Sequence, residues 1–185
     1  ERVIKEGFHE VLKPLGYKKK GNNFFIQLAE LGQIINIQKS SLSSKDHIKF
    51  TINTGLFIPE FWLAFYNFHD REIPIFPTEP ECLVRQRIGE LKNQSDTWFD
   101  IDNNSIAEDL IIEMKSSLKN HILPYFDTFN SKEKILVGLD NNTLKTERLG
   151  KLIVYGEYKQ IDKAQIEYEK IISKKGINPS FMLTI

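Results

Sequence analysis

Strict alternation of apolar and polar residues is the sequence feature that most limits the fold. It runs through residues 35–38 and again through residues 48–53. Because successive side chains of a β-strand point to opposite faces, the alternation predicts two strands, each with one buried and one polar face. The predicted buried side chains are Ile35, Ile37, Ile48, Phe50 and Ile52, and the predicted polar ones are Asn36, Gln38, Lys49, Thr51 and Asn53.

Further strands are predicted on both sides of this pair. Residues 17–28 have the pattern of a strand, a Gly-Asn-Asn turn and a second strand. Two later strands are predicted at 83–88 and 97–101, with a polar turn between them. Residues 59–69 favour a helix, since Pro59 suits a first helical turn, although their aromatic residues also fit a strand. The expected sheet is an antiparallel meander.

Helices are predicted before and after the sheet. Apolar residues at helical spacing begin at Ile4, and Gly16 suits the left-handed residue that ends such a helix. Ser105 and Glu108 have the spacing of a capping box, and they open a helix that is expected to end before Pro124. A helical pattern continues from residue 130, where Asn130 and Glu133 are a second candidate cap.

These patterns predict one fold class, α+β. We expect an antiparallel β-sheet meander with an N-terminal helix and a helix after the last strand packed on it, followed by C-terminal helices. At 185 residues the chain has room for one ordinary domain. It is expected to divide into a sheet-centred core, residues 1–129, and a helical C-terminal extension, residues 130–185, packed on or beside the core.

Composition and charge limit the partners and the compartment. The 25 basic and 25 acidic residues balance, so the chain lacks the overall positive charge of a dedicated nucleic-acid binder. Cys82 has no second cysteine to pair with, and no apolar run approaches the ~20 residues that span a bilayer. These features favour a cytoplasmic protein. The chain begins at Glu1 rather than Met, so the sequence leaves open whether a leader was removed.

Several short blocks together resemble a known family. The blocks are residues 12–21, 36–40, 52–55, 82–91, Trp98 and 123–126. In this order they resemble the bacterial domain-of-unknown-function family 4304 (DUF4304), from about residue 12 to about residue 126. The resemblance implies a helix-flanked antiparallel sheet and carries no established activity. Some small bacterial domains of this kind are suspected immunity proteins that bind and neutralise a partner toxin, which is an analogy of fold only.

Two groups of residues are candidate binding sites. Arg85 and Arg87 share one face of a predicted strand, and Trp98 stands on the next strand with Asp100 and Asp102. This group suits a partner or anion site with the indole as a platform, or simple cross-strand ion pairs on an exposed face.

The second group is amide-rich and lies where a strand ends. Gln38 and Lys39 face a polar loop there, and Asn53 lies across the meander. Amide groups can hold a small polar ligand, although such residues more often only end a strand. The loop with Ile73, Ile75 and Phe76 could pack on the domain or expose apolar side chains to a partner.

Catalytic and metal sites receive no support from the sequence. The four histidines are scattered without ligand spacing, and Glu81 beside Cys82 disfavours a thiolate. We therefore predict no catalytic residue, no metal and no cofactor. A buried structural cysteine is the favoured interpretation of Cys82.

Three functions remain as hypotheses. The first is a non-catalytic protein-binding domain that uses the polar sheet face, with a toxin-neutralising immunity protein as its more specific form. The second is a small-molecule-binding protein or hydrolase-type enzyme with a pocket on that face. The third is single-stranded nucleic-acid binding through the lysines at 18–20, which balanced charge makes the weakest. The candidate binding residues are Gln38, Lys39, Asn53, Arg85, Arg87 and Trp98.

Overall fold

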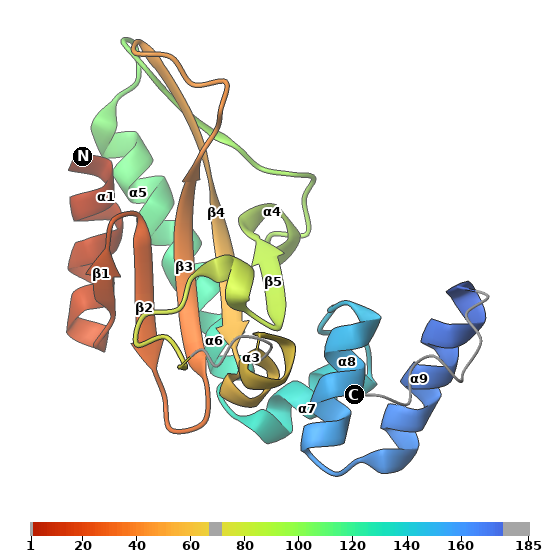
Figure 1. The fold of residues 1–185 in the computed structure, drawn as a ribbon. Helices are drawn as coiled ribbons and strands as arrows, with labels where there is room; N and C mark the ends of the chain where they lie inside the picture. The colour runs from red at the N-terminus through yellow and green to blue at the C-terminus, as the bar shows by residue number, and fades with distance from the viewer. Residues whose placement is uncertain (1, 67–71, 176–185) are drawn as a thin grey trace.

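A six-stranded antiparallel sheet forms the centre of the computed structural model, which describes residues 2–66 and 72–175 (Figure 1). Five strands follow one another in the order of the sequence: β1 (Lys18–Lys20), β2 (Asn23–Gln27), β3 (Gly32–Lys39), β4 (His47–Phe57) and β5 (Val84–Arg87). The sixth, β6 (Phe99–Asp102), also pairs with β4. The predicted α+β class and the antiparallel meander are confirmed.

The alternating residues divide between the two faces of the sheet as the pattern predicts. Ile35, Ile37, Phe50 and Ile52 are buried on one face, whereas Ile48 is only half-buried. On the other face Gln38 is exposed, but Thr51 and Asn53 are buried. The polar face is therefore covered, and not open to solvent, at these two positions. The chain ahead of β6 covers Thr51, whose hydroxyl donates to the Thr97 carbonyl at 2.7 Å.

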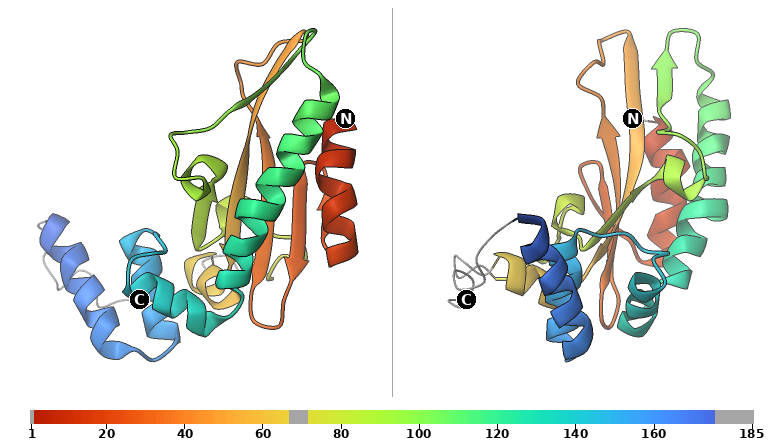
Figure 2. Two further views of the ribbon diagram at one scale, coloured as in Figure 1. Left: turned by 180° about the vertical axis from the view of Figure 1, so that it is seen from behind. Right: turned by 90° about the vertical axis from the view of Figure 1, so that its right-hand side faces the viewer.

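The first helix covers the apolar face of the sheet, beside α5 (Ala107–Ser117; Figure 2). It consists of α1 (Arg2–Ile4), a π-helical segment η1 (Lys5–His9), α2 (Glu10–Leu12) and a 3₁₀ turn η2 (Lys13–Leu15). Gly16 ends it with φ of 90°, and its N–H donates to the Lys13 carbonyl. The predicted left-handed cap is confirmed, and glycine suits it because other residues rarely adopt this φ.

The helix after the last strand is longer than predicted. It runs through α5 (Ala107–Ser117), a π-helical segment η5 (Leu118–Ile122) and α6 (Leu123–Thr128) without a break. The expected end before Pro124 is wrong. Proline lacks an N–H, and π-helical segments are one of the ways in which a helix accommodates such a disruption.

The capping box predicted at the start of this helix is also wrong. Ser105 instead closes the preceding turn, because its hydroxyl donates to Asp102 Oδ1 at 2.8 Å and accepts the Asp102 N–H at 2.9 Å. Glu108 points away and pairs with Arg2 at 2.7 Å. The helix is thereby tied to the N-terminal helix rather than to its own cap.

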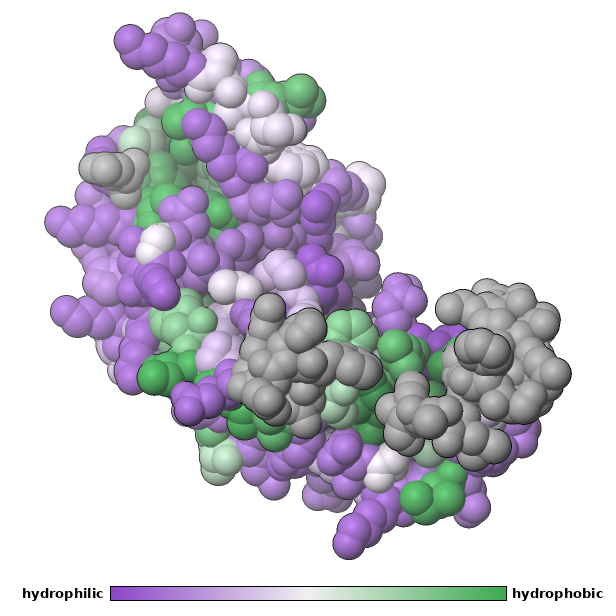
Figure 3. Space-filling model, viewed as in Figure 1, coloured by the Kyte–Doolittle hydropathy of each residue, from purple (hydrophilic) through white to green (hydrophobic). Residues whose placement is uncertain are grey.

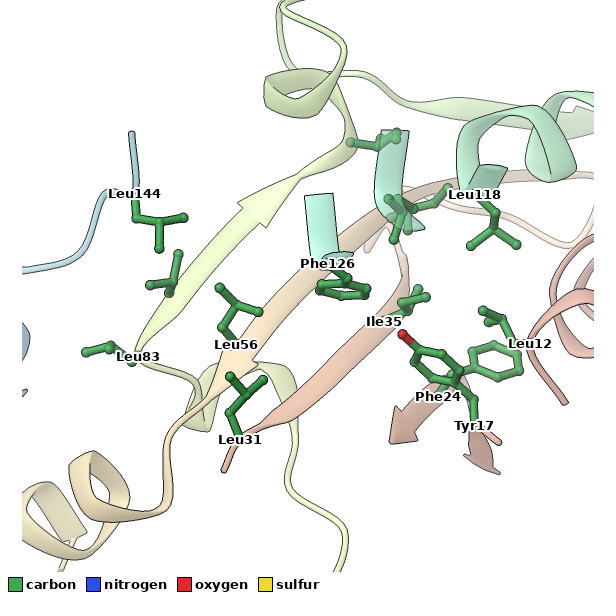
Figure 4. Packing of buried hydrophobic residues seen from close by; sticks show 14 of the residues in the cluster. Leu12, Tyr17, Phe24, Leu31, Ile35, Leu56, Leu83, Leu118, Phe126 and Leu144 are labelled. Atoms are coloured by element: carbon green, nitrogen blue, oxygen red, sulfur yellow. The ribbon is translucent and has the colours of Figure 1, made fainter. Parts of the chain in front are cut away.

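Apolar side chains from the sheet and both helices interlock in the main core (Figure 4). The buried members include Leu12, Phe24, Ile35, Leu56, Leu118 and Phe126. One polar link crosses this core: the Tyr17 hydroxyl donates to Gln33 Oε1 at 2.8 Å, and Gln33 Nε2 donates to the Phe126 carbonyl at 3.1 Å. Buried polar groups need such partners, so this link fixes α6 against the sheet.

A second, smaller cluster lies on the opposite face at one end of the sheet. It is covered by α3 (Pro59–Tyr66), whose Trp62 packs with Phe25, Ile34, Phe57 and Cys82. The predicted helix is therefore confirmed for residues 59–66. The remainder of that prediction, including His69, lies outside the described residues.

The predicted strands at 83–88 and 97–101 are present with shifted bounds, but they do not pair with each other. β5 pairs with residues 53–56 of β4, and β6 pairs with residues 47–50. β5 and β6 therefore both pair with β4, each along a different part of its length. A 3₁₀ turn η4 (Glu79–Glu81) precedes β5, and a short helix α4 (Ile88–Leu91) follows it.

The C-terminal part, as far as residue 175, contains three helices: α7 (Lys132–Asp140), α8 (Arg148–Glu157) and α9 (Ile161–Lys175). The cap of α7 is Ser131, which accepts the Lys134 N–H, and not the predicted Asn130. Ile135, Leu139 and Val154 belong to the main core cluster, so these helices pack against the sheet-centred part. The division at residue 129 stays a prediction. No helix of the described ranges has the length and apolar character to cross a bilayer.

Candidate functional site

A cavity of about 400 Å³ on the polar face of the sheet brings together four of the predicted binding residues. It is lined by Gln38, Asn53, Glu79, Arg85, Gln86, Arg87, Glu90 and Asp96. The surrounding surface over the middle of the sheet is mainly hydrophilic (Figure 3). Lys39 and Trp98 are not among the lining residues. Lys39 is paired with the buried Phe50 across the strands, so alternation directs its side chain to the opposite face.

The register of the strands explains why these side chains converge. Asn53 of β4 lies opposite Arg87 of β5, and Gly55 lies opposite Arg85. Residues at alternate positions share a face, so the prediction that Arg85 and Arg87 lie on one face is confirmed. Gly55 has no side chain, and a Cβ atom there would overlap Cys82 Sγ. The glycine therefore lets the segment before β5 lie close over the sheet.

Amide groups form the floor of the cavity. Asn53 Nδ2 donates to Gln38 Oε1 at 2.8 Å and to Asn36 Oδ1 at 3.2 Å. Asn36 Nδ2 in turn donates to Asn23 Oδ1 at 2.8 Å. This chain of hydrogen bonds crosses three strands and fixes the orientation of each amide. The floor is thus a preorganised polar surface.

Arg85 forms a two-point ion pair with Glu79 on one wall. Its Nε lies 2.7 Å from Glu79 Oε1, and its Nη2 lies 3.1 Å from Oε2. The hydrogen bond to Glu79 raises the pKa of the Arg85 guanidinium, so Arg85 stays charged. Glu79 is buried, and a buried carboxylate needs a paired cation.

Arg87 and Asp96 line the other wall, and Trp98, just outside the lining, forms a compact group with them. Arg87 Nη1 donates to Asp96 Oδ1 at 2.9 Å and to Oδ2 at 2.7 Å, and the indole N–H of Trp98 donates to Oδ2 at 3.0 Å. The Arg87 guanidinium carbon lies 5.5 Å from the centre of the Trp98 ring. The hydrogen bonds from Arg87 and then from Trp98 lower the pKa of Asp96. Arg87 is thereby held against the indole, as a cation–π pair.

The charged ladder predicted between the two later strands does not form, because those strands are not neighbours. Asp100 pairs instead with His47 at 2.7 Å, across β4 and β6. Asp102 accepts hydrogen bonds from Ser105 and Asn104 in the turn after β6. The partner of Arg87 comes from the loop, at Asp96.

Four lining residues were not identified from the sequence: Glu79, Gln86, Glu90 and Asp96. Glu90 could have been identified from its spacing, because it stands three residues after Arg87, as in a capping box. In the structure it accepts the Arg87 backbone N–H at 2.8 Å. Glu79 and Asp96 lie in connecting segments, and no local pattern marks them.

Cys82 lies beside the wall that Glu79 and Arg85 form, and its thiol is not activated for a reaction. It is buried, and burial raises the pKa of its thiol well above the usual value, with nearby Glu79 adding to the effect. Its Sγ donates to the Thr78 carbonyl at 3.7 Å. A protonated thiol is a poor nucleophile, so Cys82 acts here in packing. The cavity offers paired charges and oriented amides, which suit recognition.

Comparison with known proteins gives one match. The model of a family described as a domain of unknown function, DUF4304, matches residues 8–128. No curated protein and no solved structure matches the chain significantly. The matched residues include the whole sheet and the helix α5–α6 that packs on it. Because the match extends over more than half of the chain, the predicted resemblance is confirmed, and this protein belongs to the DUF4304 family.

Proposed function

We propose that this chain is a non-catalytic protein-binding domain that engages its partner through the polar face of the sheet. The observation that carries the proposal is the Arg87–Trp98 pair. Asp96 holds both side chains in place beside a polar cavity. Arginine and tryptophan are the residues on which binding energy at protein interfaces concentrates, and a fixed side chain loses little entropy on binding.

An exposed apolar residue on the same face of the sheet as the cavity supports the same proposal. Ile75 is 93% exposed, while the neighbouring Phe76 packs against Phe25 with ring centres 5.5 Å apart. Phe25 pairs with Ile34, and Ile34 with Gly55, so this loop lies on the same face as Arg85. A fixed loop with an exposed isoleucine is suited to an interface core, with the charged cavity as its polar rim.

The partner in the more specific form of this proposal is a bacterial toxin, which the domain would neutralise. The mixture of paired charges favours a partner surface that also carries both signs, because complementary charges select and orient a partner. The products of neighbouring genes are the first candidates, since an immunity protein and its toxin are expected to be encoded together.

A pull-down with these gene products tests the proposal. Arg87→Ala and Trp98→Ala are expected to weaken capture at least tenfold, about 1.4 kcal/mol or more each. Lys5→Ala is the matched control, because Lys5 is exposed on the first helix, which covers the other face. Capture that is equal in all four proteins would place the interface elsewhere. No capture by any neighbouring product would count against the toxin partner.

A small polar ligand is the second candidate, and the convergence of Gln38, Asn53, Arg85 and Arg87 in one cavity favours it. The volume of about 400 Å³ lies in the usual range for ligand sites, which are mostly more apolar than this one. Native mass spectrometry of the purified protein is expected to show a bound small molecule that Gln38→Ala loses. Gln38 is exposed, so its loss should leave the fold intact.

A further inference from the structure

A second cleft, of about 520 Å³, lies beyond Gln86 and Glu90, which also line the first cavity. Its walls come from the chain after β5, from the helix η5–α6 and from the residues between α7 and α8. The lining includes Gln86, Glu90, Asn120, His121, Tyr125 and Lys145. This set is rich in hydrogen-bond donors, and the cleft adjoins the proposed partner surface through Gln86 and Glu90.

The hydroxyl of Tyr125 is the first sign of a ligand. It is buried, and within the described residues it has no hydrogen-bond partner. A buried hydroxyl without a partner is costly and calls for an explanation. The ring is held in place by Phe126 and Phe129, with centres 5.5 and 5.4 Å away. Burial raises the pKa of Tyr125, so its hydroxyl stays protonated and able to donate.

Two opposite charges in the same cleft are the second sign. Lys145 is exposed and forms no ion pair within residues 2–66 and 72–175. Glu90 accepts the backbone N–H of Arg87 with Oε2, and no cation of the described residues pairs with it. The two charges therefore line one cleft without neutralising each other. A ligand that carries both a negative and a positive group would complement them.

We propose that this cleft binds a small zwitterion, an α-amino acid or a short peptide. The carboxylate would accept from the Lys145 ammonium and the Tyr125 hydroxyl, and the ammonium group would donate to Glu90. The amides of Asn120 and Gln86 would contact the rest of the ligand. The volume of the cleft suits a ligand of this size.

Thermal-shift measurements with the twenty common L-amino acids and with glycylglycine test the proposal. The compound with the largest shift is then titrated by calorimetry beside its N-acetyl derivative, its carboxamide and glucose. The intact zwitterion is expected to bind at least tenfold more tightly than either derivative, since each derivative lacks one charged contact. No binding by any amino acid or by glycylglycine up to about 10 mM, or equal binding of the derivatives or of glucose, would overturn the proposal.

Two variants separate binding from folding. Tyr125→Phe removes only the unpartnered hydroxyl, so its melting temperature is expected to be unchanged or higher while its affinity falls at least tenfold. Lys145→Met is expected to lose affinity to a similar extent. Lys119→Met is the control, because Lys119 is exposed on the same helix as Tyr125 and does not line the cleft. Wild-type affinity in both test variants would contradict the assignment.

Discussion

Glu79 and Arg85 form an ion pair whose two members differ sharply in exposure. The Glu79 side chain is 8% exposed and that of Arg85 is 54% exposed, although Arg85 Nε lies only 2.7 Å from Glu79 Oε1. Water can therefore hydrate Arg85 when its partner is lost, but it cannot hydrate Glu79 equally well. The cost of removing one partner depends on which charge is left behind.

This difference predicts unequal effects of two substitutions. Arg85→Met leaves a buried carboxylate without its cation and is expected to lower the free energy of unfolding by about 2 kcal/mol. Glu79→Gln leaves a guanidinium that solvent reaches, and we expect a loss below about 1 kcal/mol. Urea denaturation followed by circular dichroism measures both. Equal losses of unfolding free energy in the two variants would show that the difference in exposure does not determine the cost of breaking the pair.

Asp96 predicts a specific dependence of stability on pH. Hydrogen bonds from Arg87 and Trp98 lower its pKa in the folded protein. A carboxyl group with a lowered folded-state pKa stabilises the fold above its unfolded pKa, and this contribution is lost as the pH falls through the folded value. Asp96→Asn removes that contribution at every pH. The stability difference between wild type and Asp96→Asn is therefore expected to shrink below about pH 4.

Urea denaturation at several pH values between neutrality and strong acid checks this prediction. His47→Gln is a useful control, since it removes the contact with Asp100 at the other end of β4. A difference between wild type and Asp96→Asn that stays constant down to the acid limit would contradict the role assigned to the ion pair.

Lys132 joins the C-terminal helices to α3. Its ammonium pairs with Glu60 and lies 5.6 Å from the centre of the Tyr158 ring. Lys132→Met is expected to lower the free energy of unfolding by about 1–2 kcal/mol, because the partly buried Glu60 loses its cation. Hydrogen exchange in α7 and α8 should accelerate more than exchange in the central strands. Uniform acceleration would show that the whole chain unfolds as one unit.

Local periodicity accounts for what could be predicted of the fold. The alternation at Ile35–Ile37 and Phe50–Ile52 gave the correct faces, because side-chain direction in a strand depends only on the strand itself. The same rule correctly predicted that Arg85 and Arg87 lie on one face of their strand. Gly16 ended its helix as expected, since the left-handed φ is a local property.

Features that depend on the tertiary fold could not be predicted in this way. The helix continues through Pro124 because a π-helical segment precedes it, and no sequence pattern marks that segment. Ser105 bonds to Asp102 rather than capping its helix, since turn and cap compete for one hydroxyl. Glu79 and Asp96 reach the arginines from loops, so the cavity is complete only once the chain has folded around it.

Gly55 and Cys82 give the sharpest test of how the wall of the cavity is built. A Cβ atom at Gly55 would overlap Cys82 Sγ and would lie 3.0 Å from Cys82 Cβ. Gly55→Ala is therefore expected to lower the free energy of unfolding by about 1–3 kcal/mol, as overpacking does. Adding Cys82→Ala removes the sulfur and should restore part of that loss, so that the two substitutions are not additive. Urea denaturation of wild type, both single variants and the double variant measures the coupling. Strictly additive losses would mean that the backbone of β4 moves to make room and that the sulfur does not determine the spacing.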